Sequence, residues 1–264
     1  MSEKGLEATF DTVVSAYDKM RPGYAPGLFK TIFEYVSISE NSRVVEVGSG
    51  SGQATLPVLK KGCELTAAEY GENFSKLLAE KFKDYPKFSV RTGKFEELEF
   101  PSDSYDLVFS ATAFHWVPEE IGYKKVFDML KKGGAFARFA NRPQNCKNEP
   151  ELGNEIQALY EEYYNRHHNI KSGTKKWFTE EDAKAISLIP EKYGFADTEC
   201  HFFYRERVFT AKEYTGLLGT YSDHIAIEEK TRNEFFAKIE DAINRHGGTI
   251  TISDTMDLEL ARKV

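Results

Sequence analysis

The sequence is poor in cysteine and contains no long apolar run. Its 264 residues include only Cys63, Cys146 and Cys200, and their spacing predicts neither a disulfide framework nor a metal site. No stretch is long and apolar enough to span a membrane, and the polar residues 1–5 lack the apolar region of a secretory signal. We therefore expect a cytoplasmic protein with reduced cysteines and no membrane contact.

An excess of positive charge is also absent. The net charge is −7, and lysine and arginine are dispersed rather than gathered in the basic patch that grips a phosphate backbone. The 41% hydrophobic and 29% charged residues are ordinary for a globular protein and argue against disorder. We expect a small-molecule partner and no nucleic acid, with monomer and homodimer both open.

The sequence also lacks one glycine of a common nucleotide-binding motif. Residues 44–47 read as a buried parallel strand, and three alternating glycines follow at once in residues 48–52. The dinucleotide fingerprint G-x-G-x-x-G needs its third glycine where this chain has Gln53, which weakens a prediction of NAD. Backbone amides in the turn suit a carboxylate, and Glu46 suits a positive group. This combination favours S-adenosylmethionine as the ligand.

Strands and helices then alternate. A second strand is predicted at residues 65–69, and Glu69 follows Gly48 by 21 positions, where nucleotide-binding units place an acid for the ribose hydroxyls. A third strand at 88–91 leads into a loop containing Phe95, which packs against an adenine or fills the core. Ligands bind at such strand ends in open α/β sheets.

The fourth predicted strand, residues 106–110, leads into a pocket wall at 111–116. His115 in this wall is a candidate proton acceptor or donor, although a structural role is also open. A fifth strand at 135–140 is followed by a mostly helical cover at 141–194. Beyond it, the pattern predicts a long strand at residues 198–209 and helices at 211–218 and 228–246. A final strand is predicted from residue 250 onward.

Together these motifs resemble the Rossmann-like S-adenosylmethionine-dependent methyltransferases, and within them the small-molecule group that includes trans-aconitate methyltransferase. The motifs that carry the resemblance are residues 10–17 and 21–24, 45–53, 110–116, 130–134, 141–143 and 220–224. The resemblance implies an α/β fold with a seven-stranded, mostly parallel sheet whose last strand is antiparallel. It also implies helices on both faces and a helical insertion after the fifth strand.

We expect one methyltransferase domain over residues 1–264. Its parts are a helical lid at 1–36, a cofactor-binding core at 37–140, a helical substrate cover at 141–194 and the rest of the sheet at 195–264. No internal repeat or low-complexity segment divides the chain.

The loop and the resemblance together define a predicted cofactor site. In the family, the glycine loop holds the methionine part, and an acid usually follows the glycine of the third-strand loop, where this chain has Lys94. Glu96 or a backbone carbonyl is the replacement we expect. The predicted cofactor residues are Tyr17, Arg21, Glu46, Gly48, Ser49, Gly50, Gly52, Gln53, Glu69, Tyr70, Phe95, Glu96, Ser110, Ala111, Phe114 and His115.

The predicted reaction is in-line transfer of the methyl group to a small molecule, with a carboxylate or a hydroxyl favoured. For a carboxylate, Arg21 or Arg142 would hold a second acidic group. For a hydroxyl or an amine, His115 and His224 are the candidate bases. Two alternatives remain: a non-catalytic module that binds S-adenosylmethionine, and an NAD-dependent oxidoreductase.

Overall fold

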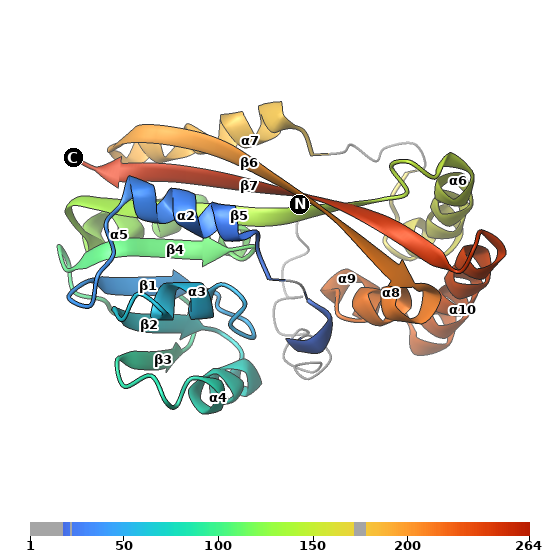
Figure 1. Cartoon of the computed structure of the whole chain (residues 1–264), viewed down its shortest axis with the longest axis horizontal. Coiled ribbons are helices and arrows are strands. Elements are labelled where there is room, and N and C mark those ends of the chain that lie inside the picture. Colours follow the sequence, from blue (N-terminus) through green and yellow to red (C-terminus); the bar gives the residue numbers. More distant parts are fainter. Residues whose placement is uncertain (1–17, 22, 172–177) are drawn as a thin grey trace.

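The computed structural model describes residues 18–21, 23–171 and 178–264. The remaining positions, including the predicted cofactor residue Tyr17, lie outside the described residues. Seven strands form one sheet in the order β3-β2-β1-β4-β5-β7-β6 (Figure 1). They are β1 (Arg43–Val47), β2 (Glu64–Glu69), β3 (Phe88–Thr92), β4 (Tyr105–Ala111), β5 (Leu130–Asn145), β6 (Phe195–Thr210) and β7 (Thr249–Lys263).

The strand pairing confirms the predicted fold class. β1 pairs in parallel with β2 and β4, β2 with β3, and β4 with β5. β7 is antiparallel to both of its neighbours, β5 and β6. The order reverses at β1, with β2 on one side and β4 on the other. Ligands of open α/β sheets bind outside the carboxyl ends of the strands at such a reversal.

Helices cover both faces of the sheet. α2, α3 and α4 pack Leu28, Val58 and Leu78 against one face, and α5 packs Tyr123 and Val126 against the other. Burial on both faces explains why the central strands are continuous apolar runs. The helices are α2 (Pro26–Tyr35), α3 (Thr55–Leu59), α4 (Glu72–Lys81), α5 (Glu119–Met129), α6 (Pro150–Leu159), α7 (Glu180–Ser187), α8 (Ala211–Leu218), α9 (Ser222–Ile225) and α10 (Glu229–Arg245). The short turns are η2 (Phe114–Trp116), the π-helical η3 (Tyr160–Asn165) and η4 (Ile189–Tyr193).

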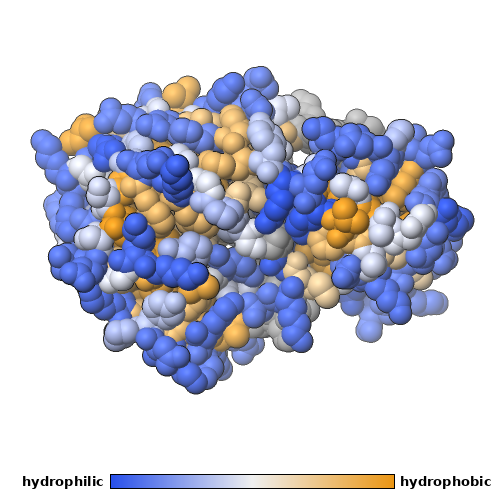
Figure 2. Space-filling model, in the orientation of Figure 1, coloured by the Kyte–Doolittle hydropathy of each residue, from blue (hydrophilic) through white to orange (hydrophobic). Residues whose placement is uncertain are grey.

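A separate apolar core lies beyond one end of the sheet. It contains Ile156 of α6, Tyr163 of η3, Phe235 and Ile239 of α10, and Ile250 of β7. We call α6, η3, α8, α9 and α10 the helical lobe. Figure 1 shows this lobe joined to the sheet by the long, twisted β6 and β7. On the same view, apolar side chains gather separately over the sheet and over the lobe, amid a mostly hydrophilic surface (Figure 2).

The fifth strand is longer than the pattern predicts. Residues 141–145, expected to open the helical cover, continue β5 because they pair with β7 from Asn141↔Met256 to Asn145↔Ile252. The helical part of the cover therefore begins at Pro150, the first residue of α6. Further along the cover, α7 begins after Thr179, which forms a capping box with Asp182. Among the described residues, no helix combines the length and the apolar character needed to cross a membrane.

Candidate active site

The glycine turn after β1 adopts a conformation that most residues avoid. Gly48, Gly50 and Gly52 have φ values of +72°, +53° and +84°. A Cβ at Gly48 would also come within 2.4 Å of the Cβ of Ala113, at the end of β4. The turn therefore requires glycine both for its dihedral angles and for its close approach to the neighbouring strand.

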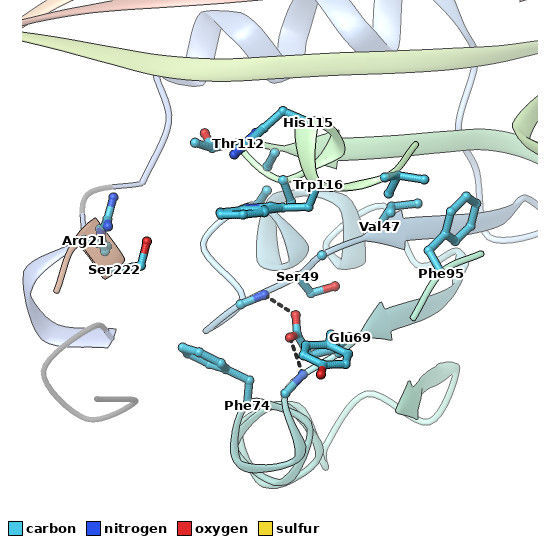
Figure 3. Close-up of a pocket in the computed structure, with 18 of the residues that line it drawn as sticks. Arg21, Val47, Ser49, Glu69, Phe74, Phe95, Thr112, His115, Trp116 and Ser222 are labelled. Carbon is cyan, nitrogen blue, oxygen red and sulfur yellow. Dashed lines mark hydrogen bonds between the residues drawn. The ribbon is translucent and has the colours of Figure 1, made fainter. Parts of the chain in front are cut away.

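Glu69, at the end of β2, is tied to this turn. Its buried carboxylate accepts hydrogen bonds from the backbone N–H groups of Gly50, at 2.8 Å, and Gly71, at 2.9 Å (Figure 3). The contact joins the ends of two adjacent strands. Glu69 therefore shapes the turn in addition to facing the cavity beside it.

Glu46 is fully buried beneath the turn. Its Oε2 accepts a hydrogen bond of 2.5 Å from the Thr55 hydroxyl, whereas its Oε1 has no hydrogen-bond partner among the described residues. Burial raises the pKa of Glu46 to about 8, and the bond from Thr55 only partly opposes this effect. A buried carboxylate oxygen without a partner is costly, so this site suits a ligand that donates a hydrogen bond or carries positive charge.

One cavity of about 600 Å³ runs past these groups. It is lined by the ends of the strands, by residues near Arg21 and by parts of the helical lobe. Figure 3 shows Phe95 beside Val47 on one side, and Arg21 and Ser222 on the opposite side. The predicted cofactor residues that line it are Arg21, Glu46, Gly48, Ser49, Gly50, Gln53, Glu69, Tyr70, Phe95, Glu96, Ala111 and His115.

Three other predicted cofactor residues lie behind the cavity wall. Ser110 is fully buried, and its hydroxyl donates to the backbone O of Val47 at 2.7 Å. Phe114 is buried in an edge-to-face contact with Tyr123. A Cβ at Gly52 would come within 2.6 Å of the ring of Phe82, the residue that follows α4. These three residues therefore pack behind the residues that line the cavity and are not placed to contact a ligand directly.

Two of the three predicted catalytic residues are engaged elsewhere. Arg142 forms a two-pronged ion pair with Asp257, at 3.0 and 3.3 Å, and its guanidinium lies 4.0 Å from the centre of the Phe178 ring. His224 is buried between Asp223, 2.9 Å from Nδ1, and Tyr160, 2.9 Å from Nε2. Among the described residues, the set that lines the cavity includes neither side chain.

His115, the third candidate, does line the cavity. Its side chain is exposed to the cavity, while nearby protein atoms remove part of its hydration and the positive charges of Arg138 and Arg142 lie close by. This desolvation, followed by the two charges, lowers the pKa of His115 to about 4. The imidazole is therefore neutral at pH 7, and a base with so low a pKa takes up a proton only weakly.

Sequence reasoning did not assign several cavity residues to the site. The 3.6-residue period places Tyr163 and His167 on one face, but η3 is π-helical, and the turn widens again where the N–H of Ile170 bonds to the O of Asn165. His167 is therefore exposed, and the next residue along faces the cavity. No sequence signal marks such a π turn. The unassigned cavity residues include Phe74, Asn141, Tyr164, His168, Ile170, Ser222 and Asp223.

Asp223 of α9 links two parts of the helical lobe to each other at this end of the cavity. Its Oδ2 accepts a hydrogen bond from the Tyr164 hydroxyl at 2.7 Å, and its backbone O lies 3.0 Å from Nε2 of His168. Burial acts to raise the pKa of Asp223, but the hydrogen bonds from His224 and Tyr164 outweigh it and hold the pKa well below its usual range. The carboxylate is thus ionised at neutral pH.

Arg21 supplies a positive charge at the same end. Its guanidinium donates to the Thr220 hydroxyl at 3.0 Å and to the Thr220 backbone O at 3.1 Å, and it lies 4.0 Å from the centre of the Tyr221 ring. Hydrogen bonds and stacking together fix the plane of an arginine. The cavity therefore has a fixed cation at the end opposite the glycine turn.

Comparison with known proteins decides the family. A model described as "Methyltransferase domain" matches residues 45–137. An uncharacterised methyltransferase of Schizosaccharomyces pombe is 26% identical, covering 85% of this chain and 83% of the relative. A second protein of that yeast, described as methyltransferase-like, is 25% identical over 91% of this chain and 88% of its own length. The chain is a Rossmann-like S-adenosylmethionine-dependent methyltransferase.

Solved structures share the fold of this methyltransferase. A candidate type II methyltransferase from Anaeromyxobacter dehalogenans aligns with a TM-score of 0.64 at 18% identity, over 92% of this chain and 98% of that one. Phosphoethanolamine N-methyltransferase 2 of Haemonchus contortus, in complex with S-adenosylhomocysteine, aligns with a TM-score of 0.57 at 14% identity. That alignment covers 96% of this chain but 57% of the nematode protein.

The cavity fits the cofactor of the methyltransferase. S-Adenosylmethionine carries an ammonium group, a carboxylate, a ribose and an adenine. The unpartnered Oε1 of Glu46 matches the positive group. The N–H groups of Gly48, Gly50 and Gly52 already bond to protein oxygens, so in this turn the N–H groups of Ser49 and Ser51 are the donors that match the carboxylate. Glu69 lies next along the strand ends, where a nucleotide-binding sheet places the acceptor for ribose hydroxyls.

Proposed function

We propose that this methyltransferase acts on a small molecule whose reacting atom is an oxygen of a carboxylate or a hydroxyl. The observation that carries the proposal is the shared cavity of about 600 Å³, lined both by the strand ends and by the helical lobe. Its volume falls within the range of roughly 300–1,000 Å³ typical of small-molecule sites. The acceptor would lie at the end lined by Arg21, Tyr164 and Asp223.

In this proposal, the protein contributes chiefly alignment. When bound, S-adenosylmethionine supplies an activated methyl group, whose bond to sulfur breaks as the new carbon–oxygen bond forms. Holding an acceptor in line for such a displacement contributes about 7 to 11 kcal/mol to lowering a barrier. A general base contributes about 100- to 10,000-fold in rate, which is a smaller effect. The enclosing wall of Trp116, Tyr164 and Tyr221 would hold the acceptor and exclude water.

The state of His115 favours a carboxylate over a hydroxyl. A carboxylate is already ionised at pH 7, whereas a hydroxyl must lose a proton as it reacts. Since the pKa of His115 is lowered to about 4, it is a weak base for that step. His224 is buried and held by Asp223 and Tyr160. A carboxylate acceptor requires neither residue as a base.

The charge of Arg21 supports the same choice. It lines the cavity, while the other arginine that the sequence suggests, Arg142, is paired with Asp257. We propose that Arg21 attracts an anionic group of the acceptor. Its contacts with Thr220 and Tyr221 orient the guanidinium in advance, which reduces the entropy lost on binding.

We also propose that residues 1–264 act as one domain. β7 contributes Met256 and Leu258 to the core under the sheet, and Ile250 and Ile252 to the core of the helical lobe. A single strand that runs through both cores supports one cooperative unit.

An acceptor screen with methyl-labelled S-adenosylmethionine tests this function. Panels of carboxylic acids, phenols, alcohols and amines would be compared. We expect transfer to a carboxylic acid, giving a methyl ester that mild base hydrolyses. A base-stable ether would shift the assignment to a hydroxyl, and the lack of transfer to any small molecule would contradict the proposal. Replacement His115→Ala should leave turnover within about twofold, because no base is needed.

A further inference from the structure

Lys125 of α5 contacts the loop that follows β3. Its Nζ donates a hydrogen bond to the backbone O of Phe95 at 2.6 Å and a second one to the backbone O of Leu98. The same Nζ lies 5.0 Å from the centre of the Phe95 ring and 5.6 Å from that of Phe100. One charged group therefore holds both the backbone and the ring of Phe95.

The loop itself is a tight turn with one side toward the cavity and the other toward Lys125. The N–H groups of Glu97 and Leu98 both donate to the O of Lys94, at 2.9 and 3.1 Å, and the N–H of Gly93 donates to the O of Glu69 at 2.9 Å. Residues 93–96 line the cavity, while the carbonyls of Phe95 and Leu98 meet Lys125. Lys125 thus donates hydrogen bonds to two backbone carbonyls, on the side of the loop away from the cavity, that the hydrogen bonds of the turn do not use.

The position of the loop indicates which part of the cofactor it meets. β1, β2 and β3 are consecutive in the sheet, and their ends present the glycine turn, Glu69 and the Phe95 loop in that order. A cofactor laid along these ends, with its ribose at Glu69, places its base at the loop of residues 93–96. Within that loop the Phe95 side chain is 4% exposed and packs in the core, so it supports the loop from below. Figure 3 shows Phe95 beside Val47, on the opposite side of the cavity from Arg21. The loop therefore faces the nucleoside end and not the acceptor.

We propose that Lys125 is a positioning residue for the cofactor: it fixes the Phe95 loop as the wall against which the adenine packs. The proposal rests on the assignment of S-adenosylmethionine to this cavity. Lys125 acts through the loop and lies behind the residues that line the cavity. Partial burial lowers its pKa.

Calorimetric titration of S-adenosylhomocysteine and 5′-methylthioadenosine into Lys125→Met tests the proposal. Methylthioadenosine carries the nucleoside without the amino-acid part. We expect both ligands to bind about tenfold more weakly, by the same factor, because two hydrogen bonds from a charged donor are lost from the nucleoside wall. The variant Lys125→Arg keeps the charge and the donors and should recover most of that affinity.

The matched control is Lys124→Met, on the same helix, where the side chain is exposed. It should bind both ligands as the unmodified protein does. Lys125→Met with unchanged affinity would overturn the proposal, as would a loss for S-adenosylhomocysteine alone or an equal loss in Lys125→Arg. Failure of the unmodified protein to bind S-adenosylhomocysteine would instead overturn the cofactor site. If Lys125→Met does not fold, Phe95→Leu tests the same wall, with weaker binding of both ligands expected.

Discussion

We propose that the cavity is divided into a cofactor half and an acceptor half, and the residues of the two halves differ in kind. The cofactor half uses backbone amides and a few carboxylates at consecutive strand ends, as at residues 48–52 and Glu69. The acceptor half uses side chains from three separate segments, near Arg21, Tyr164 and Asp223. The sequence of such a turn can vary little, because few residue types adopt its backbone dihedral angles. Side chains on a peripheral lobe change without disturbing the sheet, so substrate choice can vary around a fixed cofactor site.

The largest effect is expected from Gly48→Ala. The added Cβ meets both a positive φ of +72° and a clash at 2.4 Å with Ala113. We expect S-adenosylhomocysteine to bind more than about 100-fold more weakly, measured by calorimetry, because the strained turn must move. Gly133→Ala is the matched control: its φ is +82°, but a Cβ there has nothing within 4 Å. It should lose about 1 kcal/mol of stability and keep full affinity. Equal affinity losses in both variants would contradict the account.

A smaller loss is expected from Glu69→Gln. The neutral amide weakens the hydrogen bonds from Gly50 and Gly71 and removes a charged acceptor from the cavity. Affinity for S-adenosylhomocysteine should fall about 30-fold, since hydrogen bonds to a charged group contribute roughly 1.5–3 kcal/mol. Glu64→Gln, on the same strand, removes only an exposed ion pair with Arg43 and should leave binding within about twofold. Unchanged binding in Glu69→Gln would show that the carboxylate is dispensable.

Tyr164→Phe probes the acceptor half alone. It removes the hydroxyl that donates to Asp223 at 2.7 Å, at the end of the cavity beside Arg21. We expect the KM of the acceptor to rise about tenfold, while affinity for S-adenosylhomocysteine stays within about twofold. The neighbouring Tyr163 donates a bond of the same length to Glu234, and Tyr163→Phe should leave both quantities unchanged. A matching loss of cofactor affinity in Tyr164→Phe would erase the distinction between the halves.

The smallest effect is a pH dependence of cofactor binding from Glu46. Its pKa is raised to about 8, so the carboxyl group is mostly protonated at pH 6 and increasingly ionised toward pH 8. A positively charged ligand group favours the ionised form, and affinity for S-adenosylhomocysteine should therefore rise roughly fivefold from pH 6 to pH 8. Calorimetry of Glu46→Gln over the same range should show no such rise. A flat profile for the unmodified protein would exclude this role for Glu46.

Much of the cofactor half follows from the sequence, because its signals are local. Valines 44, 45 and 47, together with the glycines after them, predict a buried strand and a turn that the structure confirms. The interval from Gly48 to Glu69 reflects the length of one strand–helix–strand unit. Cavity contacts by Glu46, Glu69 and Phe95 follow from their places at strand ends.

The acceptor half depends on interactions between distant segments. The π-helical η3 shifts the helical phase, so that Tyr164 rather than His167 faces the cavity. Arg142 looked available because its partner, Asp257, lies 115 residues away and is brought beside it by pairing of β5 with β7. The His224–Asp223 pair is local, but its burial comes from the packing of the helical lobe. Periodicity within one segment carries no information about such contacts.

The most direct test of the account is a crystal structure with S-adenosylhomocysteine. We predict that the ligand will lie along the ends of β1, β2 and β3, with its amino-acid part at residues 48–52, its ribose at Glu69 and its adenine against the loop of residues 93–96. The end of the cavity at Arg21 and Tyr164 should stay open for the acceptor. A ligand bound outside this cavity, or one that fills the Arg21 end and leaves residues 93–96 uncontacted, would contradict the division into two halves.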